Sequence, residues 1–159
     1  MVNIVNIKIA LINSPSPFLI SDTVMSPLGI MYLSSYIKNI FKNEVECKII
    51  DLSSHTIEQS IPKISNDYHI YAFTSTTPQY NTTLKIMNEV KKNVTEKNTT
   101  FIIGGAHATC FEEKCRKDGF DCVISGEGEK SLESIIQFVK KAVENRDNSV
   151  IRGIIKSSD

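Results

Sequence analysis

The residues best suited to contact a ligand stand in short segments that directly follow apolar runs. Gly104 and Gly105 close one such run, and Gly126 and Gly128 alternate with glutamates after another. A third segment, residues 74–77, is rich in hydroxyls. Glycine lets a ligand approach the main chain because it has no Cβ, and hydroxyls supply hydrogen bonds. Tight turns and helix capping explain each segment alone, but together they indicate a binding site for a large ligand.

Other familiar kinds of site do not fit this sequence. Pro15 and Pro17 follow the first apolar run and remove amide donors that a phosphate-binding loop needs. Neither a Walker loop nor a G-x-G-x-x-G pattern occurs there, and no G-x-S-x-G elbow is present. The potential zinc ligands lack the paired spacing of a zinc site: His107, Cys110, Cys115 and Cys122. We therefore expect neither a catalytic residue nor a metal site formed by this chain alone.

Apolar runs of strand length alternate with segments of helical periodicity. We expect strands over residues 8–13, 45–50, 68–73, 100–103 and 121–124, and helices over 26–41, 56–64, 79–97, 111–118 and from 129 to 143. This alternation predicts an α/β fold with a doubly wound parallel sheet of about five strands, Rossmann-like or flavodoxin-like, with helices on both faces and strand order 2-1-3-4-5. Ligands bind beyond the carboxyl ends of such strands, where the three segments lie.

Two helix boundaries carry specific signals. Ser26 is predicted to cap the first helix through its hydroxyl, with Pro27 at the first helical position. Gly119 is predicted to end the short helix before the fifth strand in a left-handed conformation.

Length and composition narrow the class of protein. The chain has 159 residues, the size of one domain, and 18 basic residues balance 18 acidic ones. We therefore expect no nucleic-acid partner. No apolar run is long enough to span a bilayer and no signal peptide is evident, so we expect no membrane partner and a cytoplasmic location. The four cysteines are then expected to be free thiols.

Four sequence elements, in this order and at this spacing, point to one family: residues 26–36 (SPLGIMYLSSY), Asp51, residues 104–109 (GGAHAT) and residues 121–129 (DCVISGEGE). Together they resemble the N-terminal cobalamin-binding domain of cobalamin-dependent radical S-adenosylmethionine (SAM) enzymes. The resemblance covers nearly the whole chain, from the first strand to Ile155.

The resemblance implies a cobalamin-binding domain over residues 1–150, followed by a tail over 151–159 similar to the exit toward a radical SAM barrel. The corrin would lie over the strand ends, and its nucleotide tail would enter among the loops. On this basis, Gly105→Val is expected to abolish cofactor retention but leave the fold intact, because its side chain would enter the path of the tail. The implied cofactor-binding residues are Ser75, Thr76, Gly104, Gly105, Ala106, His107, Ala108, Thr109, Gly126, Glu127 and Gly128.

Two departures refine this reading. The first loop lacks the D-x-H-x-x-G motif of methionine-synthase-type domains, so we expect base-off cobalamin without a histidine ligand from that loop. The chain also lacks the C-x-x-x-C-x-x-C motif of radical SAM proteins. It therefore needs a radical SAM domain in cis or in trans to take part in methyl transfer or radical rearrangement. Two alternatives are a non-catalytic interaction module with an empty, closed pocket, and a nucleotide or small-molecule sensor.

Overall fold

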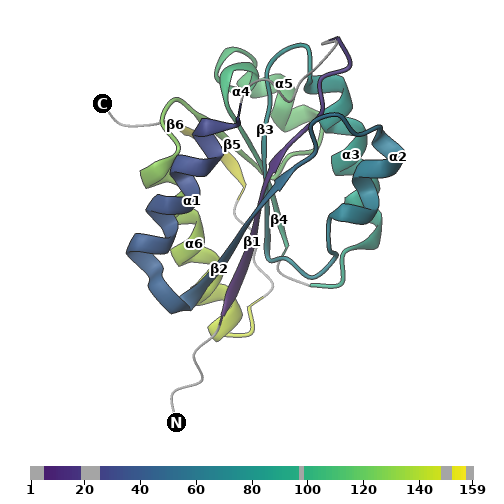
Figure 1. The fold of residues 1–159 in the computed structure, drawn as a ribbon. Coiled ribbons are helices and arrows are strands. Elements are labelled where there is room, and N and C mark those ends of the chain that lie inside the picture. The colour runs from purple at the N-terminus through teal and green to yellow at the C-terminus, as the bar shows by residue number, and fades with distance from the viewer. Residues whose placement is uncertain (1–5, 19–25, 97–98, 148–151, 157–159) are drawn as a thin grey trace.

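The computed structural model describes residues 6–18, 26–96, 99–147 and 152–156. Within these ranges one parallel sheet of six strands has the order β2-β1-β3-β4-β5-β6 (Figure 1). The strands are β1 (Ile7–Asn13), β2 (Val45–Asp51), β3 (Ile70–Thr74), β4 (Thr100–Gly104), β5 (Cys122–Ser125) and β6 (Gly153–Lys156). The predicted fold class and the order of the first five strands are confirmed.

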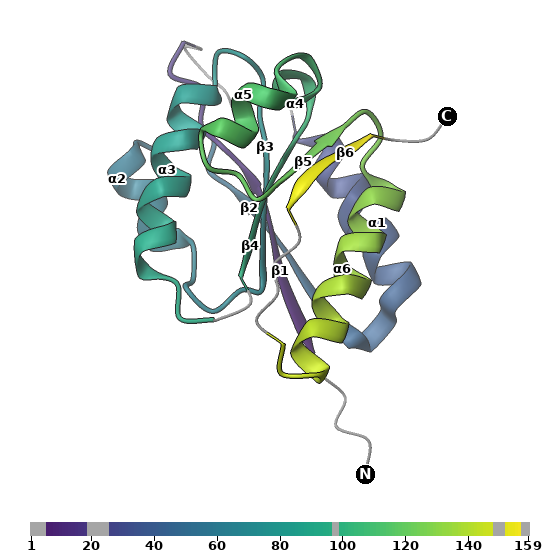
Figure 2. The ribbon, with the colours of Figure 1, turned by 180° about the vertical axis from the view of Figure 1, so that it is seen from behind.

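Helices cover both faces of the sheet. The α-helices are α1 (Leu28–Phe41), α2 (Ile57–Ser60), α3 (Tyr80–Asn93), α4 (Ala106–Cys110), α5 (Glu112–Lys117) and α6 (Glu129–Glu144). Short 3₁₀ turns, η1 (Lys42–Glu44) and η2 (Ile61–Lys63), follow α1 and α2. Helices α1 and α6 lie on one side of the sheet, and α2 and α3 lie on the other (Figures 1 and 2).

Each face of the sheet has its own hydrophobic core. Because successive strand residues point to opposite faces, Phe101 and Ile103 of β4 join the core under α3, while Ile102 joins the core under α1 and α6. All three side chains are buried. Gly104 follows Ile102 by two residues and so faces the α1–α6 side.

Several boundaries differ from the predictions. Strand β6 and helix α4 were not predicted, and α3 ends at Asn93 rather than near residue 97, which itself lies outside the described residues. The predicted Ser26 cap is wrong: α1 starts at Leu28, Pro27 occupies the cap position, and no side chain caps the helix. Pro27 instead accepts a backbone hydrogen bond from Met31, so the turn forms without the hydroxyl.

Two further sequence features have clear outcomes. Gly119 has a φ of 109°, which confirms the left-handed residue predicted after α5. All four cysteines are free thiols, as expected. None of the helices in the described ranges has both the length and the apolar character needed to cross a bilayer.

Candidate functional site

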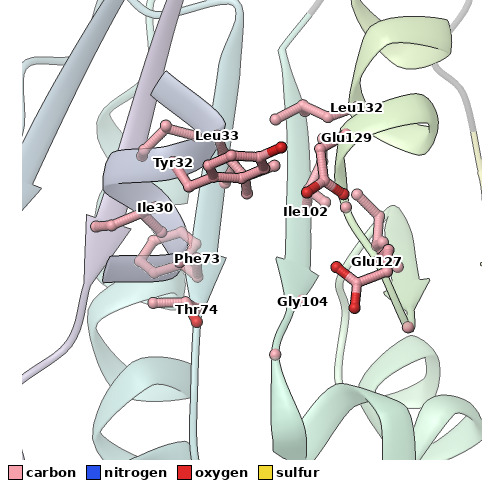
Figure 3. A pocket seen from close by; sticks show the side chains of 17 residues that line it. Ile30, Tyr32, Leu33, Phe73, Thr74, Ile102, Gly104, Glu127, Glu129 and Leu132 are labelled. Atoms are coloured by element: carbon pink, nitrogen blue, oxygen red, sulfur yellow. The ribbon is translucent and has the colours of Figure 1, made fainter. Parts of the chain in front are cut away.

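A cleft of about 220 Å³ opens between α1 and α6, at the carboxyl ends of the central strands (Figure 3). It lies over the point where the strand order reverses between β1 and β3. That reversal is where open α/β sheets bind their ligands. We call this feature the α1–α6 cleft.

The sheet forms the floor of the cleft through Leu11, Ala72, Ile102 and Ile124. These residues come from β1, β3, β4 and β5 and belong to the core under α1 and α6. Gly104 continues the floor toward the strand ends, where an added Cβ would lie no closer than 3.9 Å to Ile124. The absence of a side chain at Gly104 therefore keeps this part of the cleft open.

The first turns of α1 form one wall of the cleft, from Gly29, Ile30, Tyr32 and Leu33. A Cβ on Gly29 would meet nothing within 4 Å, so this position borders open space. The Tyr32 side chain is exposed, and its hydroxyl points across the cleft toward the α6 side (Figure 3). The helical spacing of Ile30 and Leu33 predicts the buried face of a helix, so the sequence alone does not mark this wall as part of the site.

The opposite wall comes from the loop after β5 and the first turn of α6. It includes Gly126, Glu127, Gly128, Glu129 and Leu132. Glu127 is exposed, Glu129 is half-buried and Leu132 is buried.

Two contacts fix α1 and α6 at the distance that leaves the cleft between them. A Cβ on Gly128 would lie 3.3 Å from the Leu33 side chain, so glycine permits the close approach there. One turn further along both helices, the Tyr36 hydroxyl donates a 2.7 Å hydrogen bond to Glu133. This hydrogen bond lowers the pKa of the Glu133 carboxyl.

One threonine joins the two glycine-containing loops at the end of the cleft. The Thr109 hydroxyl donates to the Gly105 carbonyl at 3.1 Å and accepts from the Gly126 amide at 3.2 Å. Gly105 and Gly126 both have positive φ, at 91° and 84°. Thr109 therefore fixes the relative positions of the loops that follow β4 and β5, although its side chain does not line the cleft.

The packing of the protein around position 105 requires a glycine there. A Cβ at this position would lie 2.8 Å from Thr74 Oγ1 and 3.2 Å from the Ser75 carbonyl oxygen. A valine at position 105 would therefore collide with the end of β3 before it reached a ligand. The expectation that Gly105→Val leaves the fold intact is wrong.

The structure brings together five of the eleven residues predicted to bind the cofactor. Those that line the α1–α6 cleft are Gly104, Gly105, Gly126, Glu127 and Gly128. The six that do not line it are Ser75, Thr76, Ala106, His107, Ala108 and Thr109.

Local hydrogen bonds occupy the hydroxyls of Ser75 and Thr76. Ser75 is buried and donates to the Thr76 carbonyl at 2.9 Å. Thr76 is exposed and donates to the Gln79 side chain at 2.9 Å, at the start of α3. These side chains organise the loop after β3.

The unpredicted helix α4 turns His107 and Ala108 away from the cleft into the protein. The His107 ring stacks on Tyr80 at 3.9 Å between centroids and lies 4.8 Å from the Phe111 ring. Its Nδ1 is 3.2 Å from Thr77 Oγ1, and its Nε2 is buried without a partner among the described residues. Burial lowers the pKa of His107, so the structure favours the neutral imidazole.

The chemistry of the cleft suits a flat organic group better than a phosphate. Its floor and much of both walls are apolar, with glycines at the strand ends. Among the described residues that line it there is no Lys, Arg or His, and the charged groups are the carboxylates of Glu127 and Glu129. An anion in this cleft would meet like charge.

Comparison with solved structures confirms the architecture. The N-terminal domain of a hypothetical protein from Thermotoga maritima matches with a TM-score of 0.55 and 20% identity, over 88% of this chain and 99% of that chain. RcsB, solved as two dimers bound to two parallel DNAs, matches with a TM-score of 0.54 and 9% identity, over 91% of this chain and 63% of that chain. At these identities the similarity shows the fold alone.

Sequence comparison gives the family. No curated protein matches the chain, but the family model for the B12 binding domain matches residues 21–136. This match spans more than half of the chain, including all of α1, the sheet from β2 to β5 and the first half of α6. The chain therefore belongs to the B12 binding domain family, and its cofactor is cobalamin.

Proposed function

We propose that this domain holds cobalamin with its nucleotide tail in the α1–α6 cleft, without a protein histidine on cobalt, and presents it to a radical SAM domain. The intact system would carry out methyl transfer or a radical rearrangement. The cofactor supplies the cobalt–carbon chemistry when bound, and this chain's residues bind it, orient it and exclude water. The four free thiols are consistent with a reducing compartment such as the cytoplasm.

The observation that carries the tail placement is the open, glycine-lined end of the cleft. Gly104 lines the cleft, and a Cβ there would contact the protein only at ordinary distances of 3.9 Å. The lack of a side chain at Gly104 is therefore not needed for packing. It is explained by a ligand that passes across the end of β4.

The positions of the histidines support binding without a protein histidine on cobalt. All three lie in the described ranges, and none lines the cleft. His69 precedes β3, at the opposite end of the sheet, and its Nδ1 accepts from the Lys8 amide. In the segment after β2, His55 Nδ1 lies 2.8 Å from the Ser53 carbonyl oxygen. His107 is part of α4 and is buried.

The same geometry argues against the closed interaction module and against a nucleotide sensor. An interaction module with a closed pocket does not account for the open cleft. A sensor for a nucleoside di- or triphosphate would need donors for several phosphate charges, whereas the tail of cobalamin carries a single phosphodiester and the charged side chains on the cleft are Glu127 and Glu129.

Direct binding tests the proposal. Purified protein is mixed with hydroxocobalamin and methylcobalamin, and binding is followed by the visible spectrum and by calorimetry. We expect wild type to retain both corrinoids, Gly104→Ala to bind more weakly, and Gly104→Val to lose binding because its branches occupy the tail's path. Folding of each variant is checked by thermal unfolding.

Thr100→Val is the matched control. Thr100 lies on the same strand and the same face as Gly104, at the other end, and its hydroxyl is buried without a partner among the described residues. We expect this variant to bind like wild type. Retention of corrinoid by a folded Gly104→Val protein would contradict the tail placement.

The cobalt ligand is tested separately by electron paramagnetic resonance of the bound cob(II)alamin. We expect no nitrogen hyperfine splitting in wild type, and the same spectrum in His55→Ala. Splitting that disappears in His55→Ala would show that this histidine ligates cobalt and would overturn binding without a protein histidine, whereas splitting that persists in both proteins would contradict the expected absence of a nitrogen ligand.

Strand β6 is consistent with a radical SAM partner in cis. It runs parallel to β5 and pairs with it from Cys122↔Gly153 to Ser125↔Lys156, so Lys156 lies at the cleft end of the sheet. A domain joined after this strand would start beside the cofactor. The partnership is tested by sequencing the encoding gene and its neighbours. A barrel domain with a C-x-x-x-C-x-x-C motif, in the same reading frame or in an adjacent gene, would support it. Absence of such a domain from both places would contradict it.

A further inference from the structure

We propose that the α1–α6 cleft selects among corrinoids by the chemistry of the lower base, and that it favours a benzimidazole over a purine. This inference rests on the proposed function, because it requires the nucleotide tail to lie in the cleft.

Most of the floor of the cleft offers a base no hydrogen-bonding side chain; the exception is Thr74 at the end of β3, which also lines the cleft. Leu11, Ala72 and Ile102 are apolar and at most 8% exposed. The strands that carry them are internal, so their backbone groups are engaged by neighbours: Leu11 pairs with Ala72, and Ala72 pairs with Ile102. A ring lying on this floor therefore meets hydrocarbon.

The two helical walls have the same character close to the sheet. Ile30 of α1 and Leu132 of α6 are 4% and 1% exposed, and both line the cleft. The Leu132 amide donates to the Gly128 carbonyl. The apolar surface thus continues from the floor onto both walls.

Polar side chains are found toward the mouth of the cleft. Tyr32 is 62% exposed, and Glu127 is exposed as well. Glu129 is half-buried and lies on the α6 wall opposite Tyr32 (Figure 3). Its carboxylate can accept a hydrogen bond from a group within the cleft, as the Thr74 hydroxyl can at the end of β3.

The apolar floor and walls favour binding of a benzimidazole over binding of a purine. The methyl groups of a dimethylbenzimidazole gain apolar contacts on the floor. A purine brings an exocyclic amine and extra ring nitrogens, which lose water there and find no partner among the side chains of Leu11, Ala72 and Ile102. We therefore expect cobalamin to bind about tenfold or more tightly than the corrinoid with adenine as its base.

The experiment compares three corrinoids on the wild-type protein by calorimetry: cobalamin, its adenine-containing analogue and cobinamide, which lacks the nucleotide tail. We expect affinity to fall in that order. Equal or tighter binding of the adenine form would overturn the selectivity. No binding of any corrinoid, or cobinamide binding as tightly as cobalamin, would instead overturn the proposed placement of the tail.

A pair of alanines gives matched variants. Ala72→Ser adds a hydroxyl to the floor and should reduce the preference for cobalamin over the adenine form. Ala10→Ser makes the same change on β1, on the opposite face of the sheet and in the other core, and should leave that preference unchanged. An unchanged preference in Ala72→Ser would overturn the role of the floor.

Glu129→Gln tests whether the Glu129 carboxylate on the α6 wall contributes to the choice of base. Because the selectivity is assigned to apolar surface, we expect this variant to keep the wild-type preference. A preference that changes severalfold in Glu129→Gln would show that the carboxylate reads the base and would overturn the assignment.

Discussion

Gly105 approaches the end of β3 so closely that a Cβ there would lie 2.8 Å from the Thr74 hydroxyl oxygen. The neighbouring Gly104 has no such contact, since the nearest atoms to its Cβ would be 3.9 Å away. Two adjacent glycines in one motif therefore differ in their surroundings: Gly105 permits the packing of two strand ends, and Gly104 keeps the end of the α1–α6 cleft open.

The first prediction concerns this difference. Gly105→Ala combines a φ of 91° with a clash against β3, so we expect it to lower the free energy of unfolding by about 1–3 kcal/mol or more. Gly104→Ala should change stability by less than about 1 kcal/mol. Urea unfolding of both variants provides the measurement, and equal stabilities would contradict the assigned roles.

The second prediction concerns Thr109 as a positioning residue. Thr109→Val removes both hydrogen bonds, to the Gly105 carbonyl and from the Gly126 amide. We expect corrinoid affinity to fall several-fold while the protein stays folded, because the two loops lose their connection. Thr109→Ser keeps the hydroxyl and should restore the affinity, whereas a serine variant as weak as valine would point to lost methyl packing.

The third prediction concerns pH. Burial lowers the pKa of both His107 and His69; Lys114 further lowers that of His107, and Asp118 partly opposes the shift. Their neutral forms therefore stabilise the fold fully above the unfolded-state pKa of about 6.5, and this stability is lost as the pH falls through that value toward the folded-state pKa. The expected loss is at most about 1.4 kcal/mol per pH unit for each histidine.

His107→Phe tests the contribution of one ring, because phenylalanine can stack on Tyr80 but cannot titrate. Urea unfolding between about pH 7.5 and 5.5 should show a shallower pH dependence than in wild type, with His69 accounting for what remains. Carboxyl groups whose pKa is lowered, such as Asp118, lose their contribution only at lower pH. An unchanged slope would show that His107 does not titrate on unfolding.

The fourth prediction concerns the thiols. Cys110 is exposed, whereas Cys47, Cys115 and Cys122 are buried, and burial raises the pKa of Cys122 to about 11. Since the thiolate is the reactive form, a thiol reagent should modify one cysteine rapidly in the native protein and four after denaturation. Cys110→Ser should abolish the rapid phase, and a rapid phase that remains would contradict the buried positions of the others.

Much of the fold follows from the sequence because internal parallel strands are continuous apolar runs. Strand β1 is such a run and is identified without its partners. Strand β6 is not, because it is four residues long and lies at the sheet edge with its central residues half-buried. Helix α4 has only five residues, too few for periodicity to be recognised.

The candidate site could be predicted where glycines follow apolar runs, together with Glu127 between two of them. Gly104 and Gly126 end or follow apolar runs, so the sequence marks them. Tyr32 and Gly29 line the cleft from within a helix, and their role depends on how α1 faces α6. His107 belongs to the same motif as the glycines, but helix α4 turns its ring into the core, and no local pattern predicts that rotation.

The α1–α6 cleft also has a thermodynamic consequence. Leu11, Ala72 and Ile102 belong to a hydrophobic core, yet they also form the floor of an open space. A ligand bound there would cover these residues and would bind the folded state alone. The folded state is then stabilised in proportion to the logarithm of the ligand concentration divided by the ligand's dissociation constant. Melting temperature should therefore rise with corrinoid supply, and turnover of the protein by proteases would follow the availability of the vitamin.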